Sequence, residues 1–287
     1  MSRRLAAATF PRTILPPRGA ALLAALTVVA VALTGTSPED AFAQTKPKMG
    51  GWLGVMMEAS KGKSGVMVTH VIHNSPAEKG GFLAGDRIVK LDGTAVAAPG
   101  EVSAPVAAKG AGKSITVDIV RAGKAQTLTV VLAPKPKPDD IFRMEMLGRT
   151  IPLATLVLVS GAGPTAYPAL DGHVVVVDLF ATWCGPCAAA TPHLQALHDK
   201  YAPQGVTVLA ISDEDTGTLS TWTTKNGVGY TVASDPTDVA FTQWGAPALP
   251  SSLVVDKHGV VREVEVGFDL ASVKRTELLV QALLKEP

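Results

Sequence analysis

The chain is organised around an uninterrupted apolar run that ends in a pair of cysteines. Residues 174–192 read VVVVDLFATWCGPCAAATP, so four valines lead through Asp178 to Cys184 and Cys187. A run of this length in which nearly every residue is apolar is typical of a strand covered on both faces, at the centre of an α/β sheet. Pro186 fits the first turn of a helix, where its missing N–H is not needed. The pattern therefore predicts that Cys184 lies where a buried strand passes into the N-terminus of a helix.

This position determines the chemistry expected of the two thiols. The first N–H groups of a helix have no partner within it, and the helix dipole adds partial positive charge there. Both effects stabilise a thiolate, so we expect the pKa of Cys184 to be lowered and its sulfur to be nucleophilic near neutral pH. Cys187 lies one turn deeper, where it can attack a mixed disulfide formed on Cys184. The pair is expected to act as a redox-active disulfide without a further cofactor.

Two other uses of a C-x-x-C pair fit this sequence less well. A structural zinc site needs four ligands, and Cys184 and Cys187 are the only cysteines of the chain. His193 and His198 follow on the same expected helix, but His193 is turned away from Cys187, and His198 lies about 16 Å further along the axis. A structural disulfide that closes so short a loop would constrain little of the unfolded chain. We therefore expect no metal site and a redox role for the pair.

The segment around the cysteines resembles the active site of thioredoxin-fold proteins, and more widely the exported TlpA-like thiol–disulfide oxidoreductases. The residues that carry the resemblance are DGHVVVVDLFATWCGPC at 171–187 and PHLQALHDKYAPQGVTVLAISDED at 192–215. The resemblance implies an α/β thioredoxin fold over residues 144–287 and a protein-disulfide oxidoreductase activity.

The resemblance also implies roles for particular side chains. Pro250 matches by position the cis-proline that faces the C-x-x-C motif in this fold, and X–Pro is the one kind of bond whose cis form costs little, about 0.5–1 kcal/mol. Leu249 stands where the family usually has Thr or Val, and its backbone would pair with an extended substrate. Asp178 matches the acid that aids proton transfer for the second cysteine, and burial should raise its pKa. The catalytic set is then Cys184, Cys187, Asp178 and Pro250, and the substrate-binding set is Trp183, Gly185, Pro186 and Leu249.

The roles of Pro250 and Asp178 each have an alternative. Leu249–Pro250 could belong to an ordinary trans turn. Asp178 could lie at the end of the strand, where it is exposed to solvent or caps a turn.

Around this segment, strands and helices are expected to alternate from Gly148 onward. The expected elements are an edge strand or hairpin over 151–159, a strand over 206–212, helices over 184–201, 218–226, 235–244 and 270–284, and a hairpin formed by 252–256 and 260–266.

A mainly β domain is expected ahead of the redox domain, over residues 50–133. GWLGV at 51–55 and HNSPAEKGGFLAGDRIVKLDGTAV at 73–96 resemble a PDZ domain of the bacterial HtrA-type arrangement. The resemblance implies a groove that binds the C-terminus of a peptide or protein, completed by a helix within 101–109, where the ligand adds as an edge strand. Backbone N–H groups would bind its carboxylate at Trp52, Leu53, Gly54 and Val55. The alternative is that this domain serves as a spacer or a dimer contact.

The two ends of this domain are expected to be a targeting segment and a linker. Residues 1–43 begin with arginines, contain an apolar core of 14 residues at 20–33 and end in Ala-Phe-Ala, which fits a cleaved signal peptide. An uncleaved membrane anchor is the alternative. In both cases the rest of the chain is expected outside the cytoplasm, in the periplasm or cell envelope. Residues 134–143, rich in proline and lysine, are expected to form an extended linker.

The net charge of +1 gives no electrostatic case for binding nucleic acid. Gly-Pro between the cysteines, and the absence of a cation in the three alanines after Cys187, favour a reductase of disulfide-containing protein clients, supplied by a membrane electron donor. A disulfide oxidase or isomerase is one alternative. Another is a PDZ-led envelope adaptor or quality-control factor whose thioredoxin-like domain mainly binds.

Overall fold

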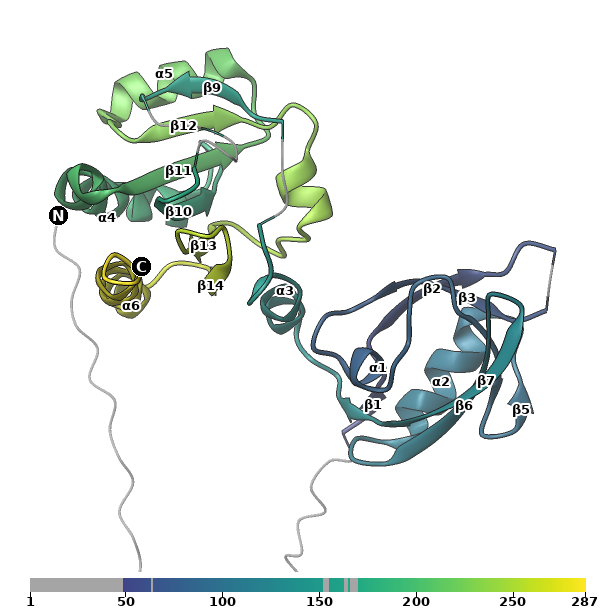
Figure 1. The fold of residues 1–287 in the computed structure, drawn as a ribbon. Helices are drawn as coiled ribbons and strands as arrows, with labels where there is room; N and C mark the ends of the chain where they lie inside the picture. Colours follow the sequence, from purple (N-terminus) through teal and green to yellow (C-terminus); the bar gives the residue numbers. More distant parts are fainter. Residues whose placement is uncertain (1–48, 63, 152–154, 163–164, 166–169) are drawn as a thin grey trace, which may run out of the picture. The chain divides into compact units, whose positions relative to one another are not determined.

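The computed structural model describes residues 49–287 except 63, 152–154, 163–164 and 166–169. The expected signal peptide at 1–43 lies outside the described residues. Within them the chain forms two separate six-stranded sheets, each with a core of its own (Figure 1). This is the expected fold class, a mainly β domain followed by an α/β domain.

The first domain is an antiparallel sheet closed by two helices. Its main sheet has the order β2-β3-β4-β6-β7, with β5 paired to β4, and a separate two-stranded sheet joins β1 to β8. Strand β2 is therefore an edge strand. The strands are β1 Gly51–Trp52, β2 Val55–Ala59, β3 Val66–Val71, β4 Arg87–Leu91, β5 Thr94–Ala95, β6 Ser114–Arg121, β7 Lys124–Val131 and β8 Ala133–Pro134, and the helices are α1 Pro76–Lys79 and α2 Pro99–Lys109.

Local sequence signals explain several of these elements. Ser75 caps α1 by accepting a hydrogen bond from the Glu78 N–H, and Pro76 follows it at the start of the helix. The β6–β7 hairpin turns at Ala122 and Gly123, whose φ angles of 48° and 81° are those of a tight hairpin turn.

The expected linker at 134–143 is mostly wrong. Ala133–Pro134 pair with β1, and helix α3 occupies Pro138–Met146. Proline at the first helical position and two aspartates in the first turn favour a helix start here. Phe142 and Met146 then place one face of α3 in the core of the second domain. Alternating proline indicated extended chain, but burial of these two side chains outweighs it.

The second domain is a mixed sheet with the order β14-β13-β10-β11-β12-β9. Strands β10, β11 and β12 are parallel, and the outer strands are antiparallel to their neighbours. The strands are β9 Val157–Ser160, β10 Val174–Leu179, β11 Val206–Ser212, β12 Thr231–Ser234, β13 Ser251–Val255 and β14 Val261–Val266. The helices are α4 Gly185–Tyr201, α5 Thr216–Asn226 and α6 Leu270–Leu283, with short helical turns η2 at Ala202–Gln204 and η3 at Val239–Gln243.

Every residue of β10 is buried, and its two faces serve two different cores. Val174 and Val176 pack with residues of α4, α5 and α6, whereas Val175, Val177 and Leu179 pack with residues of α3 and η3. Figure 1 shows α4 and α6 on one side of this sheet and α3 on the other. Since side chains alternate along a strand, Asp178 points to the side of α4 and α6.

Most of the expected elements are confirmed within a few residues. Residues 152–154 of the edge strand expected at 151–159 lie outside the described residues, and β9 occupies Val157–Ser160. The segment expected to be an α-helix at 235–244 contains a π-helical turn at Val239–Gln243. The buried Asp235 carboxylate accepts a hydrogen bond from the Ala240 N–H at 2.7 Å, which is an interaction that sequence periodicity does not reveal.

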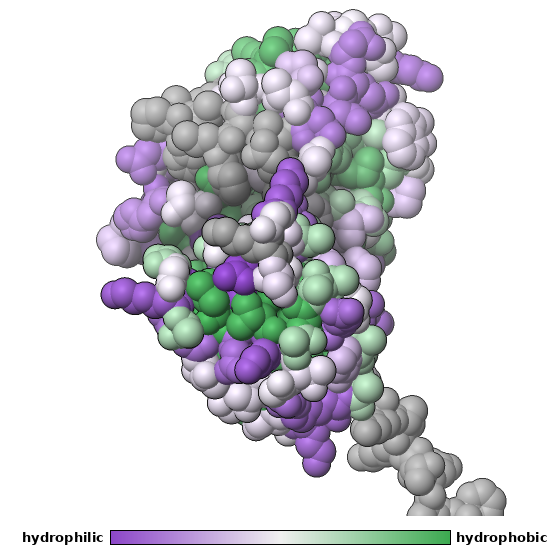
Figure 2. Space-filling view, turned by 90° about the vertical axis from the view of Figure 1, so that its right-hand side faces the viewer, coloured by the Kyte–Doolittle hydropathy of each residue, from purple (hydrophilic) through white to green (hydrophobic). Residues whose placement is uncertain are grey.

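Some apolar residues remain at the surface. Figure 2 shows one face on which hydrophobic side chains gather among hydrophilic ones.

In the part of the chain that the structure describes, no helix has the length and apolar character needed to cross a membrane.

Candidate functional site

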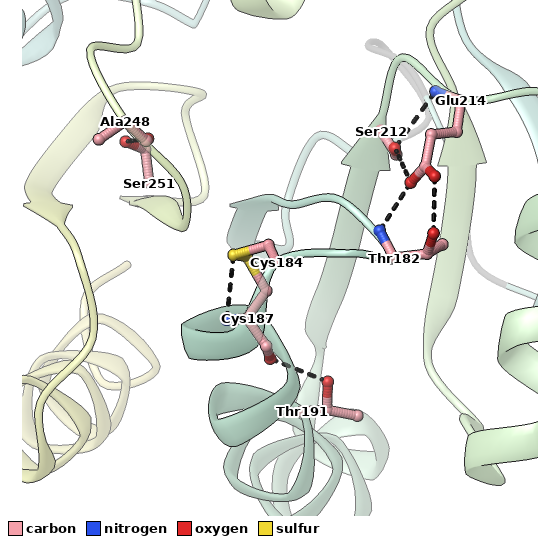
Figure 3. The surroundings of a disulfide bond; sticks show 8 residues. All are labelled: Thr182, Cys184, Cys187, Thr191, Ser212, Glu214, Ala248 and Ser251. Carbon is pink, nitrogen blue, oxygen red and sulfur yellow. Dashed lines mark hydrogen bonds between the residues drawn. A yellow bond between two sulfur atoms is a disulfide. The ribbon is translucent and has the colours of Figure 1, made fainter.

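The two cysteines lie at the junction of β10 and α4, where the sequence predicts them. Cys184 is the N-cap of α4 and forms a disulfide with Cys187 (Figure 3). The Cys187 N–H donates to the Cys184 sulfur at 3.2 Å. Cys184 is 6% exposed and Cys187 only 2%. In the reduced protein, the same N–H and the helix dipole would stabilise a thiolate on Cys184.

The predicted substrate-contacting residues surround the pair on the surface. Gly185 and Pro186 are exposed, and Trp183 has 76% of its surface accessible to solvent. An indole ring so exposed beside a reactive sulfur is available for contact with a protein client. Leu249 is half-buried against the core cluster that contains both cysteines.

The predicted cis-proline is confirmed. The Leu249–Pro250 bond is cis, and Pro250 is buried. The Ser251 hydroxyl donates to the Ala248 carbonyl at 2.7 Å, which closes the turn around this bond (Figure 3).

Asp178 is buried, so the exposed alternative is excluded. It is 5% exposed, and burial raises its pKa from 3.8 to about 7. Among the described residues, none forms a hydrogen bond or ion pair with its carboxyl group. That group lines a cavity of about 50 Å³ whose walls come from α4, α6 and the segment around Pro250. This volume suffices for water beside the carboxyl group.

No three His, Cys, Asp or Glu side chains come together as a possible metal site in the described ranges. The two histidines of α4 make ring contacts instead. His193 stacks on Phe268 with ring centroids 5.6 Å apart, and His198 lies edge-on to Tyr230 at 6.4 Å.

Sequence reasoning missed one carboxylate near the cysteines. Glu214, just after β11, binds both the backbone N–H and the hydroxyl of Thr182, two residues before Cys184. The only signal in the sequence is the acidic run SDED at 212–215, which by itself is typical of a solvated loop.

A separate groove in the first domain contains the four residues predicted to bind a peptide. Trp52, Leu53, Gly54 and Val55 line a groove of about 390 Å³ together with residues of α2, including Val102 and Val106. The helix lies where the sequence placed it. Because β2 is an edge strand, its outer backbone groups are available to an added strand.

Two further residues shape this groove. Gly54 has a φ of 88°, and a side chain on it would approach the Ser75 Cβ to 2.3 Å, so only glycine fits there. Lys135 also lines the groove, because β8 pairs with β1 and brings the following residue beside it. This cation was not predicted at the groove, because residues 134–143 were expected to form a linker.

The raised pKa of Asp178 predicts a defined pH dependence of stability. The unfolded chain releases this proton near pH 3.8, whereas the folded protein keeps it up to about pH 7. The contribution of Asp178 to the free energy of unfolding is therefore largest below about pH 4, and it is lost as the pH rises through about 7. Asp178→Asn cannot ionise, so its free energy of unfolding relative to the wild type should increase across this window, by on the order of 4 kcal/mol at most, and then stay constant.

Urea unfolding of the oxidised proteins at several pH values measures this difference. Asp199→Asn, at an exposed position of α4, serves as the control. The free energies of unfolding of Asp178→Asn and wild type are then plotted against pH. If the difference between them stays constant from about pH 4 to about pH 8, the raised pKa of Asp178 is contradicted.

Comparison with known proteins agrees with both domains. Residues 51–132 match the PDZ domain family, and residues 147–264 match the AhpC/TSA family. The thiol-disulfide oxidoreductase ResA of Bacillus anthracis is 30% identical over 99 residues, which are 34% of this chain and 57% of that protein. ResA of Geobacillus thermodenitrificans is 28% identical over 97 residues, or 33% of this chain and 56% of that protein. The chain thus spans little more than half the length of these curated relatives.

Solved structures match each domain separately. A putative thiol:disulfide interchange protein DsbE from Chlorobium tepidum is 28% identical, covers 46% of this chain and 95% of its own, and has a TM-score of 0.42. The HtrA-type protease AlgW with a decapeptide is 28% identical, covers 31% of each chain and has a TM-score of 0.30. The family matches thus give this chain a PDZ domain over residues 51–132, followed by a thioredoxin-fold AhpC/TSA-family domain over residues 147–264 that is similar to thiol-disulfide oxidoreductases of the ResA kind.

Proposed function

We propose that this protein is an exported thiol–disulfide oxidoreductase that reduces disulfide bonds in protein clients. The observation that carries the proposal is the placement of Cys184 at the N-cap of α4, with its sulfur receiving the Cys187 N–H and Trp183 exposed beside it. The kinship with ResA proteins supports the same chemistry. The signal peptide expected at residues 1–43 and the redox pair together favour an extracytoplasmic site of action.

The reaction proceeds by two thiol–disulfide exchanges. The Cys184 thiolate attacks one sulfur of the client disulfide, an S–S bond forms between protein and client, and the other client sulfur leaves as a thiolate. Cys187 then loses its proton and attacks the Cys184 sulfur, which releases the second client thiolate. The client gains two electrons and the protein is left with the Cys184–Cys187 disulfide.

Asp178 is the proposed acceptor of the proton that Cys187 loses. With a pKa of about 7, its carboxyl group can both take up and release a proton near neutral pH. The water-sized cavity beside it lets that proton return to solvent. Cys187 and Asp178 lie on the same side of the sheet, facing the core that contains α4.

The composition of the first turn of α4 supports reduction as the direction of reaction. After the N-cap this turn contains Gly185, Pro186 and Cys187, so the helix itself brings no cation to the Cys184 sulfur. A thiolate without such a cation favours a reducing pair over a strongly oxidising one. A membrane-bound dithiol donor would return the pair to its reduced form. Disulfide oxidation or isomerisation is the alternative that a measured potential distinguishes.

The PDZ domain is proposed to recruit clients or partners through their C-termini. Its groove combines an edge strand, apolar side chains of α2 and the Trp52–Val55 turn, as needed for an added strand that ends in a carboxylate. Lys135 supplies positive charge at the groove, which favours the same kind of ligand. An adaptor whose thioredoxin-like domain only binds would keep this groove but would not need a reducible cysteine pair.

The redox proposal predicts different phenotypes for the two cysteines. Cys184→Ser should abolish reduction of insulin disulfides, because the attacking thiolate is missing. Cys187→Ser should retain the first attack and accumulate a mixed disulfide with the client, because resolution requires the second thiol. Turbidity assays with dithiothreitol as reductant, and non-reducing gels, measure both effects. Wild-type activity in Cys184→Ser would exclude this mechanism.

The groove proposal predicts carboxylate-dependent peptide binding by the full chain. Peptides with free apolar C-termini should bind, and amidation of the C-terminus should weaken binding by about tenfold or more, because a charge-assisted contact is lost. Ala107→Glu, which lines the groove, should also weaken binding, whereas Ala108→Glu, exposed but outside it, should not. Fluorescence titration with labelled peptides measures this. Equal binding of free and amidated peptides would exclude the carboxylate site.

A further inference from the structure

Besides the backbone hydrogen bond from the Phe180 N–H to the Ile211 carbonyl, a carboxylate just after β11 holds the loop between β10 and α4. One oxygen of Glu214 accepts the Thr182 backbone N–H at 2.6 Å, and the other accepts the Thr182 hydroxyl at 2.6 Å (Figure 3). Both residues are half-buried. Two hydrogen bonds from one residue to the two oxygens of a carboxylate fix distance and orientation together.

Glu214 is itself held by the ends of two parallel strands. The Ser212 hydroxyl donates to the Glu214 carboxylate at 3.1 Å, and the Glu214 N–H donates back to the Ser212 oxygen at 3.2 Å. The Ser234 hydroxyl donates to the Glu214 carbonyl at 2.7 Å. Ser212 ends β11, Ser234 ends β12, and both are buried. The position of Glu214 is thus set by the centre of the sheet.

Glu214 and its neighbour Asp215 in the acidic run at 212–215 do not form a cation site, because their carboxylates bind different backbone and side-chain groups. Asp215 caps α5, where its carboxylate accepts the N–H groups of Gly217 and Thr218 at 2.9 Å. Glu214 points the other way, to Thr182. The two neighbouring acids therefore serve two separate structural tasks.

Thr182 is followed directly by Trp183 and Cys184, which contact the client in the proposed function. Trp183 is exposed, and the Cys184 N–H donates to the Ala181 carbonyl at 3.1 Å, so the loop turns tightly around Thr182. We propose that Glu214 is a positioning residue that holds this loop, so that the Cys184 sulfur stays at the N-terminus of α4 and Trp183 keeps its orientation toward clients. This inference rests on the proposed thiol–disulfide exchange.

Two uncharged variants separate the hydrogen bonds from the charge. In Glu214→Gln the amide can accept the Thr182 N–H and donate to the Thr182 hydroxyl, so both contacts are retained. In Glu214→Ala both are lost. We expect the reduced Ala variant to show a slower alkylation of Cys184 at neutral pH and a lower kcat/KM for insulin, each by about tenfold relative to the Gln variant. Its midpoint potential should be more negative than that of the Gln variant, because its thiolate is less stabilised.

Two controls distinguish positioning from general stability. Glu277→Ala removes a carboxylate that binds Lys200 and Tyr201 at the other end of α4, and it should leave Cys184 alkylation unchanged even if the melting temperature falls. If Glu214→Ala does not fold, Thr182→Val, which loses the hydroxyl, is compared with Thr182→Ser, which keeps it, and the same direction is expected.

The outcomes are separable from those of the proposed function. Equal alkylation rates and potentials in Glu214→Ala and Glu214→Gln would overturn the positioning role, even with a lower melting temperature in the Ala variant. If wild-type protein does not reduce insulin, the proposed function fails, and alkylation of Cys184 still decides whether Glu214 positions it.

Discussion

The structure of the redox domain depends on the complete burial of strand β10. All six of its residues are buried, and its side chains alternate between two cores that together hold the helices of this domain. A strand in this position cannot shift its register by one residue without exchanging its two faces. Its end, and with it the start of α4, is therefore fixed in space. This packing determines where the cysteine pair lies, and the contacts of the loop before Cys184 then hold the pair in place.

The same burial creates the electrostatic contrast on which the chemistry depends. Cys184, at a helix N-terminus, lies where negative charge is stabilised, whereas Asp178, six residues earlier in a covered strand, lies where negative charge is penalised. A sulfur at a helix N-terminus and a carboxyl group that ionises reluctantly are thus brought to one side of one sheet. In the proposed mechanism, these two groups are the nucleophile and the proton acceptor.

The sequence predicted the parts of this protein that depend on local patterns. The apolar run and the helix start at Pro186 are each determined by neighbouring residues, and both are confirmed. The alternation of side chains along β10 also indicates that Asp178 faces the core that contains α4. The cis bond before Pro250 followed from the resemblance alone, since proline permits a cis bond without requiring one.

What the sequence did not predict depends on contacts between distant residues. The extent of α3 is set by burial of Phe142 and Met146 in a core formed mostly by residues after position 170. Lys135 reaches the peptide groove only because β8 pairs with β1, more than eighty residues earlier in the chain. Glu214 contacts Thr182 only because β10 and β11 are neighbours in the sheet. Such placements follow from sheet order, which no local pattern encodes.

The claim that the cysteine pair works as a reductant is tested most directly by its midpoint potential. The oxidised and reduced full chain would be equilibrated in dithiothreitol buffers of defined ratio, and the free thiols counted after alkylation. If the pair acts as a reductant, its potential should lie near that of reducing thioredoxins, about −270 mV. A potential near that of strong oxidants, about −120 mV, would contradict the account and assign the protein to disulfide formation instead.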